Sequence, residues 1–180
     1  MKVNKSFIQG SYIIEPKVFG DNRGFFLETY NIENYRSIVG ENINFVQDNH
    51  SYSTLGSLRG LHFQLNKPQG KLVRVIQGEV LDVVVDLRKN SPTFLSWDSV
   101  ILSGDNKKQF WVPPGLAHGF LVLSDNADVE YKCTNTYDPD DEYTLIWNDQ
   151  KIGIEWASKN PILSEKDAKG LSLDEVIEII

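Results

Sequence analysis

Short segments rich in β-branched and aromatic residues run through the chain, and they constrain its fold more than any other feature. Glycine, asparagine, aspartate and proline separate these segments at roughly even spacing. Many short strands joined by tight turns are typical of a β-sandwich or β-barrel. We expect strands at residues 11–16, 24–30, 45–53, 58–65, 71–77, 79–87, 96–102, 109–112, 117–123, 129–135 and 144–147. The pattern predicts one closed, all-β structure of the jelly-roll kind.

Helical patterns are limited to residues 32–39, a turn near 164–167, and residues 172–180. The last stretch begins with Ser172 and has Glu175 three residues later, which matches a helix capping box. Gln77-Gly78 separates two strand-like runs and is predicted to form a hairpin turn. No repeat, low-complexity tract or linker divides the 180 residues, so we expect a single domain spanning residues 1–180.

Charge and composition exclude several classes of partner. A net charge of -7 argues against non-specific binding to nucleic acid, but it leaves a small anionic ligand possible. No stretch approaches the ~18 apolar residues of a membrane helix, and the first residues lack the apolar region of a signal peptide. The lone Cys133 has no partner for an internal disulfide. We therefore expect a cytoplasmic protein with no membrane or nucleic-acid partner.

Two histidines lie in glycine-punctuated, strand-like segments. His62 belongs to Arg59-Gly60-Leu61-His62-Phe63-Gln64, and His118 follows Pro113-Pro114-Gly115. Because an imidazole can take and return protons near neutral pH, this arrangement indicates a catalytic pocket inside a barrel. The alternative for each histidine is a structural side chain satisfied in the core.

Strand alternation sorts the other candidates. Tyr131 shares a face with Val129 and Cys133 and is expected to point inward, either as a core tyrosine or as an acid. Lys71 enters an apolar strand, where it either reaches solvent or places a cation against a developing oxyanion.

Two aspartates complete the set of candidates. Asp82 lies in an apolar run and needs a hydrogen-bonding partner. Asp167 either orients a histidine, as carboxylates do in catalytic dyads, or lies on the surface of a helix.

A metal centre is a weaker hypothesis. The stretch from Pro113 to His118 is similar to the second motif of the cupin superfamily, many of whose members bind a metal. Metal-binding cupins carry His-x-His in their first motif, whereas this chain has His62-Phe63-Gln64. Glutamine is a poor ligand for the metals that favour imidazole, so we expect acid/base chemistry without a metal.

Taken together, the motifs resemble the dTDP-4-dehydrorhamnose 3,5-epimerase family. The resemblance covers nearly the whole chain, at residues 20–26, 45–49, 58–64, 71–75, 82–88, 91–93, 113–120, 147–149, 152–156 and 161–167. It implies a cupin-type jelly-roll with a few short peripheral helices, usually a homodimer, that acts on a nucleotide-linked 4-keto-6-deoxy sugar without a metal or other cofactor.

The resemblance also implies a role for each site residue. His62 would be the base, oriented by Asp167; Lys71 would stabilise the enolate, and Tyr131 would return a proton from the opposite face. The substrate-binding residues would be Arg23 and Arg59 at the diphosphate, Gln47 and Asn49 at the sugar or phosphate, Glu28 at the nucleotide, Tyr137 stacked on the base, and His118 in the sugar pocket. Strand alternation puts Arg59 and His62 on opposite faces of the strand. A bulge, or a second subunit that contributes Arg59 or Arg23, is therefore needed to bring both residues to one ligand.

The expected function is 3,5-epimerisation of dTDP-4-dehydro-6-deoxy-D-glucose in dTDP-rhamnose biosynthesis. One alternative is an enzyme that inverts C3 or C5 only, or that acts on another 4-keto sugar nucleotide. A second is a non-catalytic cupin that binds a sugar nucleotide, which would not need an acid and a base together. A metal-dependent cupin oxygenase or isomerase is disfavoured by Gln64.

Overall fold

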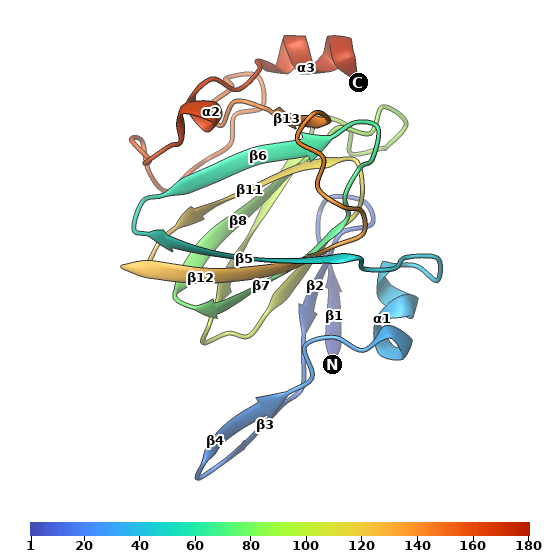
Figure 1. The fold of residues 1–180 in the computed structure, drawn as a ribbon, viewed down its shortest axis with the longest axis vertical. Coiled ribbons are helices and arrows are strands. Elements are labelled where there is room, and N and C mark those ends of the chain that lie inside the picture. Colours follow the sequence, from blue (N-terminus) through green and yellow to red (C-terminus); the bar gives the residue numbers. More distant parts are fainter.

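The computed structural model describes residues 1–180 and contains two antiparallel sheets that face each other (Figure 1). The six-stranded sheet consists, in spatial order, of β1 (Lys2–Lys5), β2 (Tyr12–Glu15), β10 (Gln109–Val112), β7 (Lys71–Gln77), β12 (Asn126–Cys133) and β5 (Gln47–Thr54). The five-stranded sheet consists of β13 (Glu142–Thr144), β6 (Leu58–Gln64), β11 (Leu116–Val122), β8 (Glu79–Asp86) and β9 (Trp97–Ser103). The predicted all-β jelly-roll class is confirmed.

A separate hairpin and three short helices lie at the periphery. The hairpin, β3 (Val18–Asp21) and β4 (Gly24–Leu27), projects away from the two sheets (Figure 1). The helices are α1 (Ile32–Val39), α2 (Glu165–Ala168) and α3 (Leu173–Ile179). The predicted capping box is present at the start of α3, where Ser172 and Glu175 bond reciprocally. None of these helices has the length and apolar character needed to cross a membrane.

The predicted hairpin at Gln77-Gly78 is wrong. β7 and β8 belong to different sheets, so this turn carries the chain from one sheet to the other. Gly78 has a φ of 80°, and a Cβ there would lie 2.0 Å from the carbonyl oxygen of Asn126. Glycine is needed for both reasons, but a tight turn does not determine which strands pair. β7 pairs instead with β10 and β12, and β8 pairs with β11 and β9.

Alternating side chains divide the core into three clusters. The largest fills the space between the sheets and includes Val73 and Val129. A second cluster packs α3 on the outer face of the five-stranded sheet, and the third packs Tyr35 of α1 on the outer face of the six-stranded sheet. Lys71 and Val73 alternate with Leu72 along β7, and Leu72 packs with Tyr35. Lys71 therefore faces the space between the sheets.

A buried carboxylate at the end of β8 should make stability depend on pH. Asp86 is fully buried and accepts hydrogen bonds from the side chains of Arg88, Ser91 and Thr93. Burial alone would raise the pKa of Asp86, but these hydrogen bonds lower it to about 2. A lowered pKa stabilises the folded state above the unfolded value, near 4, and this stabilisation is lost as the pH falls toward 2.

We expect Asp86→Asn to remove about 2 kcal/mol of this stabilisation at neutral pH. The difference in unfolding free energy between wild type and variant should shrink as the pH falls from about 4 to about 2. Denaturant unfolding at several pH values measures it, with Asp174→Asn, an exposed carboxylate on α3, as the matched control. A difference that stays constant over this range would contradict the assignment.

Candidate active site

A pocket between the two sheets collects most of the predicted catalytic residues. The five-stranded sheet contributes His62 from β6, while the six-stranded sheet contributes Lys71 from β7 and Tyr131 from β12. Asn49, Gln64, Tyr137 and Glu142 also line the pocket. Side chains from opposite sheets therefore reach one small volume.

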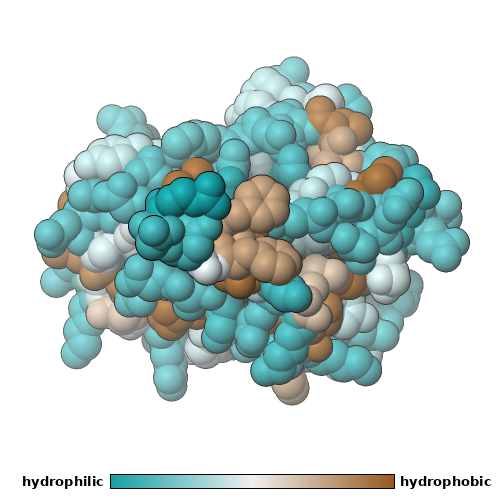
Figure 2. Space-filling model, turned by 90° about the horizontal axis from the view of Figure 1, so that it is seen from below, coloured by the Kyte–Doolittle hydropathy of each residue, from teal (hydrophilic) through white to brown (hydrophobic).

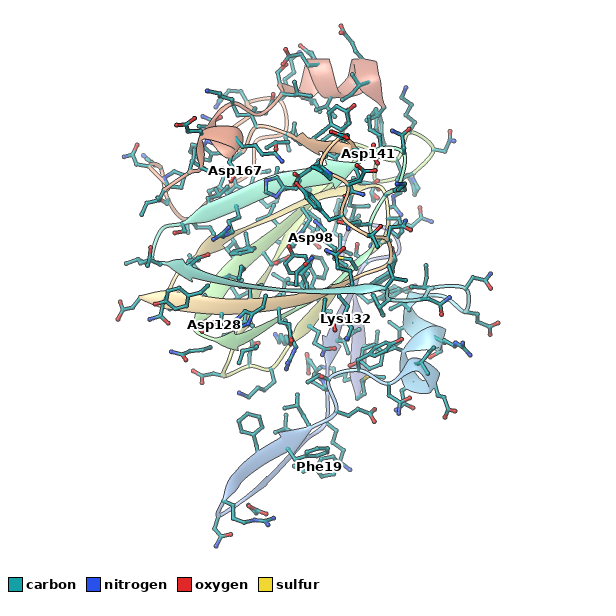
Figure 3. All side chains as sticks on the ribbon, viewed as in Figure 1. Phe19, Asp98, Asp128, Lys132, Asp141 and Asp167 are labelled. Carbon is teal, nitrogen blue, oxygen red and sulfur yellow. The ribbon has the colours of Figure 1, made fainter.

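His62 is hydrogen-bonded to the carboxylate of Asp167. Its Nε2 lies 2.6 Å from Asp167 Oδ1. Asp167 is 4% exposed and is held at the start of α2, where its backbone N–H donates to the side chain of Ser164, the N-cap residue. Figure 3 shows Asp167 on this short helix, next to β6. The sequence-based pairing of His62 with Asp167 therefore matches the geometry.

The charge of Asp167 is stabilised by its neighbours. Burial would raise the pKa of Asp167, but the hydrogen bond and charge of His62, with the hydrogen bond to Ser164, hold it below its usual value. The carboxylate is therefore ionised at neutral pH. An ionised carboxylate fixes the ring orientation and stabilises the imidazolium that forms when the histidine takes a proton.

The second ring nitrogen of His62 faces a carboxylate that sequence reasoning missed. Nδ1 lies 3.9 Å from Oε1 of Glu142, which is on β13 directly opposite Gln64. Glu142 Oε2 accepts hydrogen bonds from the hydroxyl of Tyr137, at 2.8 Å, and from the ammonium of Lys166. Burial would raise the pKa of Glu142, but the bonds from Lys166 and Tyr137 lower it. Its sequence context is a run of acidic residues, and nothing in that run distinguishes Glu142.

Lys71 and Tyr131 lie together on the other side of the pocket. Lys71 is 9% exposed, and its Nζ is 5.8 Å from the centroid of the Tyr131 ring. Burial lowers the pKa of Lys71, while negative charge at nearby groups, including Asp82 and Glu142, opposes that shift. Burial raises the pKa of Tyr131, so its phenol keeps its proton at neutral pH. One group can stabilise an oxyanion and the other can donate a proton.

Comparison with known proteins identifies the family. A family model described as dTDP-4-dehydrorhamnose 3,5-epimerase matches residues 5–175. The chain belongs to this family. The dTDP-4-dehydrorhamnose 3,5-epimerase of Shigella flexneri is 54% identical over 171 residues, which cover 94% of each sequence. The predicted family and enzyme class are therefore confirmed.

Solved structures of related epimerases share the fold. The Legionella pneumophila dTDP-6-deoxy-D-glucose-3,5-epimerase, in complex with dTDP-4-keto-L-rhamnose, has a TM-score of 0.93 and 48% identity, covering 98% of this chain and 94% of that one. ChmJ, a 3'-monoepimerase from Streptomyces bikiniensis in complex with dTDP-quinovose, has a TM-score of 0.90 and 32% identity, covering 96% and 88%. The same fold therefore occurs both in a 3,5-epimerase and in an enzyme that is a 3'-monoepimerase.

A bulge in β6 brings Arg59 to the same side of the enzyme as His62. His118 of β11 pairs with His62, and Phe120 pairs with Arg59, so two residues of β6, Gly60 and Leu61, lie opposite the single residue Gly119 of β11. Gly60 lies in the bulge with a φ of 116°, and a Cβ there would be 2.6 Å from Gly119 Cα. Arg59 and His62 consequently line one pocket with Lys166 and Asp167. The bulge that strand alternation required is present.

Gln47, Asn49 and Tyr137 form a connected polar edge of the pocket. Gln47 Nε2 donates to Asn49 Oδ1 at 2.9 Å, and Gln47 Oε1 accepts from the backbone N–H of Tyr137 at 2.8 Å. Tyr137 is 49% exposed, so its side chain is accessible to a ligand. The predicted binding residues of β5 are thus next to the predicted stacking residue.

His118 is buried, whereas the resemblance implied that it lines the sugar pocket. It is 5% exposed, and its Nε2 lies 2.9 Å from Oδ1 of Asp82. Burial lowers the pKa of His118, and the charge and hydrogen bond of Asp82 partly oppose this shift. His118 is thus the hydrogen-bonding partner that the buried Asp82 requires. In this enzyme His118 lies beside His62 on the neighbouring strand, and its ring is committed to Asp82.

Arg23 and Glu28 lie away from this pocket. Arg23 is on the projecting hairpin, where its side chain bonds to Asp21, and Glu28 follows the hairpin and bonds to Asn31 and Asn34. Figure 3 shows Phe19 on the same hairpin, far from Asp167. The surface seen from the hairpin side has an apolar patch at its centre (Figure 2). Exposed aromatic side chains on the hairpin are Phe19, Phe25 and Phe26.

Residues that could hold a metal are not clustered in the enzyme. No group of three or more His, Cys, Asp or Glu side chains is arranged to bind one. Gln64, where metal-binding cupins carry a second histidine, has its amide bonded to the main chain of Lys67 and Asp138. These side-chain contacts do not fit the donor set of a metal centre.

Proposed function

We propose that the enzyme inverts C3 and C5 of dTDP-4-dehydro-6-deoxy-D-glucose to give dTDP-4-dehydro-L-rhamnose, in a cytoplasmic setting and without a metal. One observation carries the proposal. His62, bonded to Asp167 at 2.6 Å, lines a pocket from one sheet, while Tyr131 and Lys71 line it from the other. Inversion at carbon needs a base and an acid on opposite faces of the ring, and this arrangement supplies both.

The first step is removal of a proton next to the ketone. The C4 carbonyl acidifies the hydrogens at C3 and C5, because the electron pair left by either proton delocalises onto the carbonyl oxygen. His62 Nε2 is committed to Asp167, so Nδ1 is the nitrogen that accepts the proton. Two carboxylates, Asp167 and Glu142, then stabilise the imidazolium.

The enolate oxygen needs a positive group in a site with little water. Lys71 is buried beside Tyr131, and in its ammonium form it supplies the positive charge that such an oxygen requires. Preorganised charge in a low-dielectric pocket stabilises a developing oxyanion more than water does. Lys71 therefore acts on the intermediate at C4, whichever carbon has lost its proton.

Tyr131 completes the inversion by donating its phenolic proton to the carbanion carbon from the opposite face. Burial raises its pKa, which keeps the donor protonated before the transfer. After one inversion His62 carries an extra proton and Tyr131 lacks one. Exchange with water restores both groups before the second carbon reacts, so protons from the solvent enter the product.

The nucleotide is held beside the sugar by the polar edge of the pocket. Tyr137 stacks on the base, Gln47 and Asn49 bond the sugar or phosphate, and Arg59 neutralises the diphosphate. Lys166, which lines the Arg59 pocket, adds a second cation there. His118 supports His62 from the neighbouring strand.

A homodimer completes the site. Arg23 and Glu28 belong to a hairpin segment that does not reach the pocket of its own chain, and the hairpin exposes Phe19, Phe25 and Phe26. Burial of these rings against a second copy would favour association, and Arg23 would then face the partner's diphosphate. Light scattering should report twice the mass of one chain. The monomer mass at micromolar concentration would sink this part of the proposal.

Incubation with dTDP-4-keto-6-deoxyglucose in heavy water tests the function. NMR and mass spectrometry should find deuterium at both C3 and C5 of a product inverted at both carbons. Absence of exchange on this substrate, with exchange on another 4-keto sugar nucleotide, would reject the substrate assignment.

Inversion at one carbon is the second candidate function. It is favoured by the likeness to the 3'-monoepimerase of Streptomyces bikiniensis, which has the same fold. Deuterium at a single carbon in the same experiment would establish it. The higher identity to 3,5-epimerases, 54% for the Shigella flexneri protein, favours inversion at two carbons.

Replacing Asp167 with asparagine should slow the reaction on the order of 10²-fold, because the amide neither fixes the imidazole nor stabilises its charge as a carboxylate does. The loss should appear in kcat more than in KM, since Asp167 bonds to His62 and Ser164. Steady-state kinetics measures it, with Asp174→Asn, which changes an exposed carboxylate on α3, as the control. A kcat within threefold of wild type would contradict the role of Asp167.

A further inference from the structure

Gln64 bonds the main chain on both sides of Tyr137. It is 6% exposed and lies two residues after His62 on β6. Its Oε1 accepts from the backbone N–H of Asp138 at 3.1 Å, and its Nε2 lies 3.4 Å from the carbonyl oxygen of Thr136. The amide therefore spans Tyr137, in the segment that joins β12 to β13.

The same amide connects this segment to a rigid anchor. Gln64 Nε2 also donates to the carbonyl oxygen of Lys67 at 2.8 Å. The loop around Lys67 is fixed by Asp141, a buried carboxylate that accepts from the backbone N–H groups of Asn66 and Lys67 at 2.9 and 2.8 Å. Figure 3 shows Asp141 beside β13. Gln64 thus joins the Tyr137 segment to a loop that cannot shift without breaking buried bonds.

The ring of Tyr137 itself is less constrained by packing. Tyr137 is 49% exposed, and its hydroxyl bonds to Glu142 at 2.8 Å. Because packing holds the ring only in part, its position depends on the hydroxyl bond to Glu142 and on the main-chain hydrogen bonds of its segment. Gln47 supplies one of these bonds, from β5, and Gln64 supplies those from β6.

We propose that Gln64 is a positioning residue for Tyr137, and that it sets the distance between the nucleotide base and the imidazole of His62. The inference rests on the proposed stacking of Tyr137 on the base of the substrate. The two side chains His62 and Gln64 are on the same strand, so one rigid element defines both the reacting end and the base-binding end of the pocket. Gln64 stands where metal-binding cupins carry their second histidine, and here its side chain bonds main-chain groups of Lys67 and Asp138 instead of a metal.

The first test follows hydrogen exchange of the segment, which does not depend on substrate. In Gln64→Met, a replacement of similar length, the amide of Asp138 loses its acceptor. We expect its exchange rate, measured by NMR, to rise at least about tenfold, as for loss of one or two buried hydrogen bonds. Gln77→Met, at the exposed end of β7, is the matched control and should leave the rate unchanged.

The second test is a double-mutant cycle with dTDP as the probe. Gln64→Met should weaken dTDP binding, measured by calorimetry, about tenfold in the wild-type background. In the Tyr137→Ala background the same change should have no further effect, because Gln64 acts through Tyr137. For the epimerisation, KM should rise by a similar factor while kcat stays within threefold, since His62 keeps Asp167.

The outcomes separate this inference from the proposed function. Equal weakening of dTDP binding in both backgrounds, or unchanged exchange at Asp138, would overturn the role of Gln64. If dTDP does not bind the wild-type enzyme, the proposed function fails, while the exchange measurement still decides whether Gln64 holds the segment.

Discussion

Replacing His62 with alanine should abolish deuterium exchange at both C3 and C5, with a fall in rate of about 10⁴-fold, because a positioned base contributes up to that factor. No other side chain that lines the pocket is an imidazole bonded to a buried carboxylate. The measurement is exchange of the substrate in heavy water, followed by NMR. Loss at both carbons is expected because one base serves both.

The control for this variant is His50→Ala. His50 is an exposed histidine on β5 that bonds to Asp128, and because it alternates with Asn49 along the strand, its side chain points to the opposite face of the sheet from the pocket. It should retain wild-type exchange, and circular dichroism should show that both variants are folded. Exchange in the His62 variant at the wild-type rate would reject the mechanism.

Replacing Tyr131 with phenylalanine should reduce inversion about 10³-fold while proton removal continues, because the phenol contributes as an acid and not as the base. The proton taken by His62 can exchange with heavy water and return as deuterium to the same face. Labelled but uninverted substrate should therefore accumulate. The ratio of label in the substrate to label in the product, followed over time, is the informative quantity.

Tyr52→Phe is the matched control for this prediction. Tyr52 is 59% exposed on β5, so loss of its hydroxyl should not change either rate. If the Tyr131 variant inverted its substrate as fast as it exchanged protons, the acid would have to be another group. If it lost exchange and inversion equally, Tyr131 would serve binding rather than proton donation.

Most strands could be predicted from the sequence because their residues alternate or form short apolar runs between turn residues. The segments at 71–77 and 109–112 were predicted with the bounds of β7 and β10. β1 and β3 were not predicted. β1 reads Lys-Val-Asn-Lys and β3 is exposed along its length, so neither has the buried alternation that identifies a strand.

The catalytic candidates could be predicted for a related reason. Tyr131 lies in a strand whose alternation predicts which face is inward, and its neighbours Val129 and Cys133 are buried as expected. Glu142 could not be predicted, because its importance comes from the pairing of β13 with β6, which brings it opposite Gln64. Arg59 needed the bulge at Gly60, and register is a property of paired strands rather than of one segment.

The sequence by itself determined the all-β class, the family, and the set of acid, base and cation, because strand period and motif residues are local properties of the chain. The tertiary structure alone decided which strands pair, which ring nitrogen of His62 bonds to Asp167, and where Gln64 and Glu142 act. These are contacts between residues distant in the chain, such as Asp167 and His62, which are 105 positions apart. Such contacts form only when the two sheets and helix α2 pack together, and no local pattern records them.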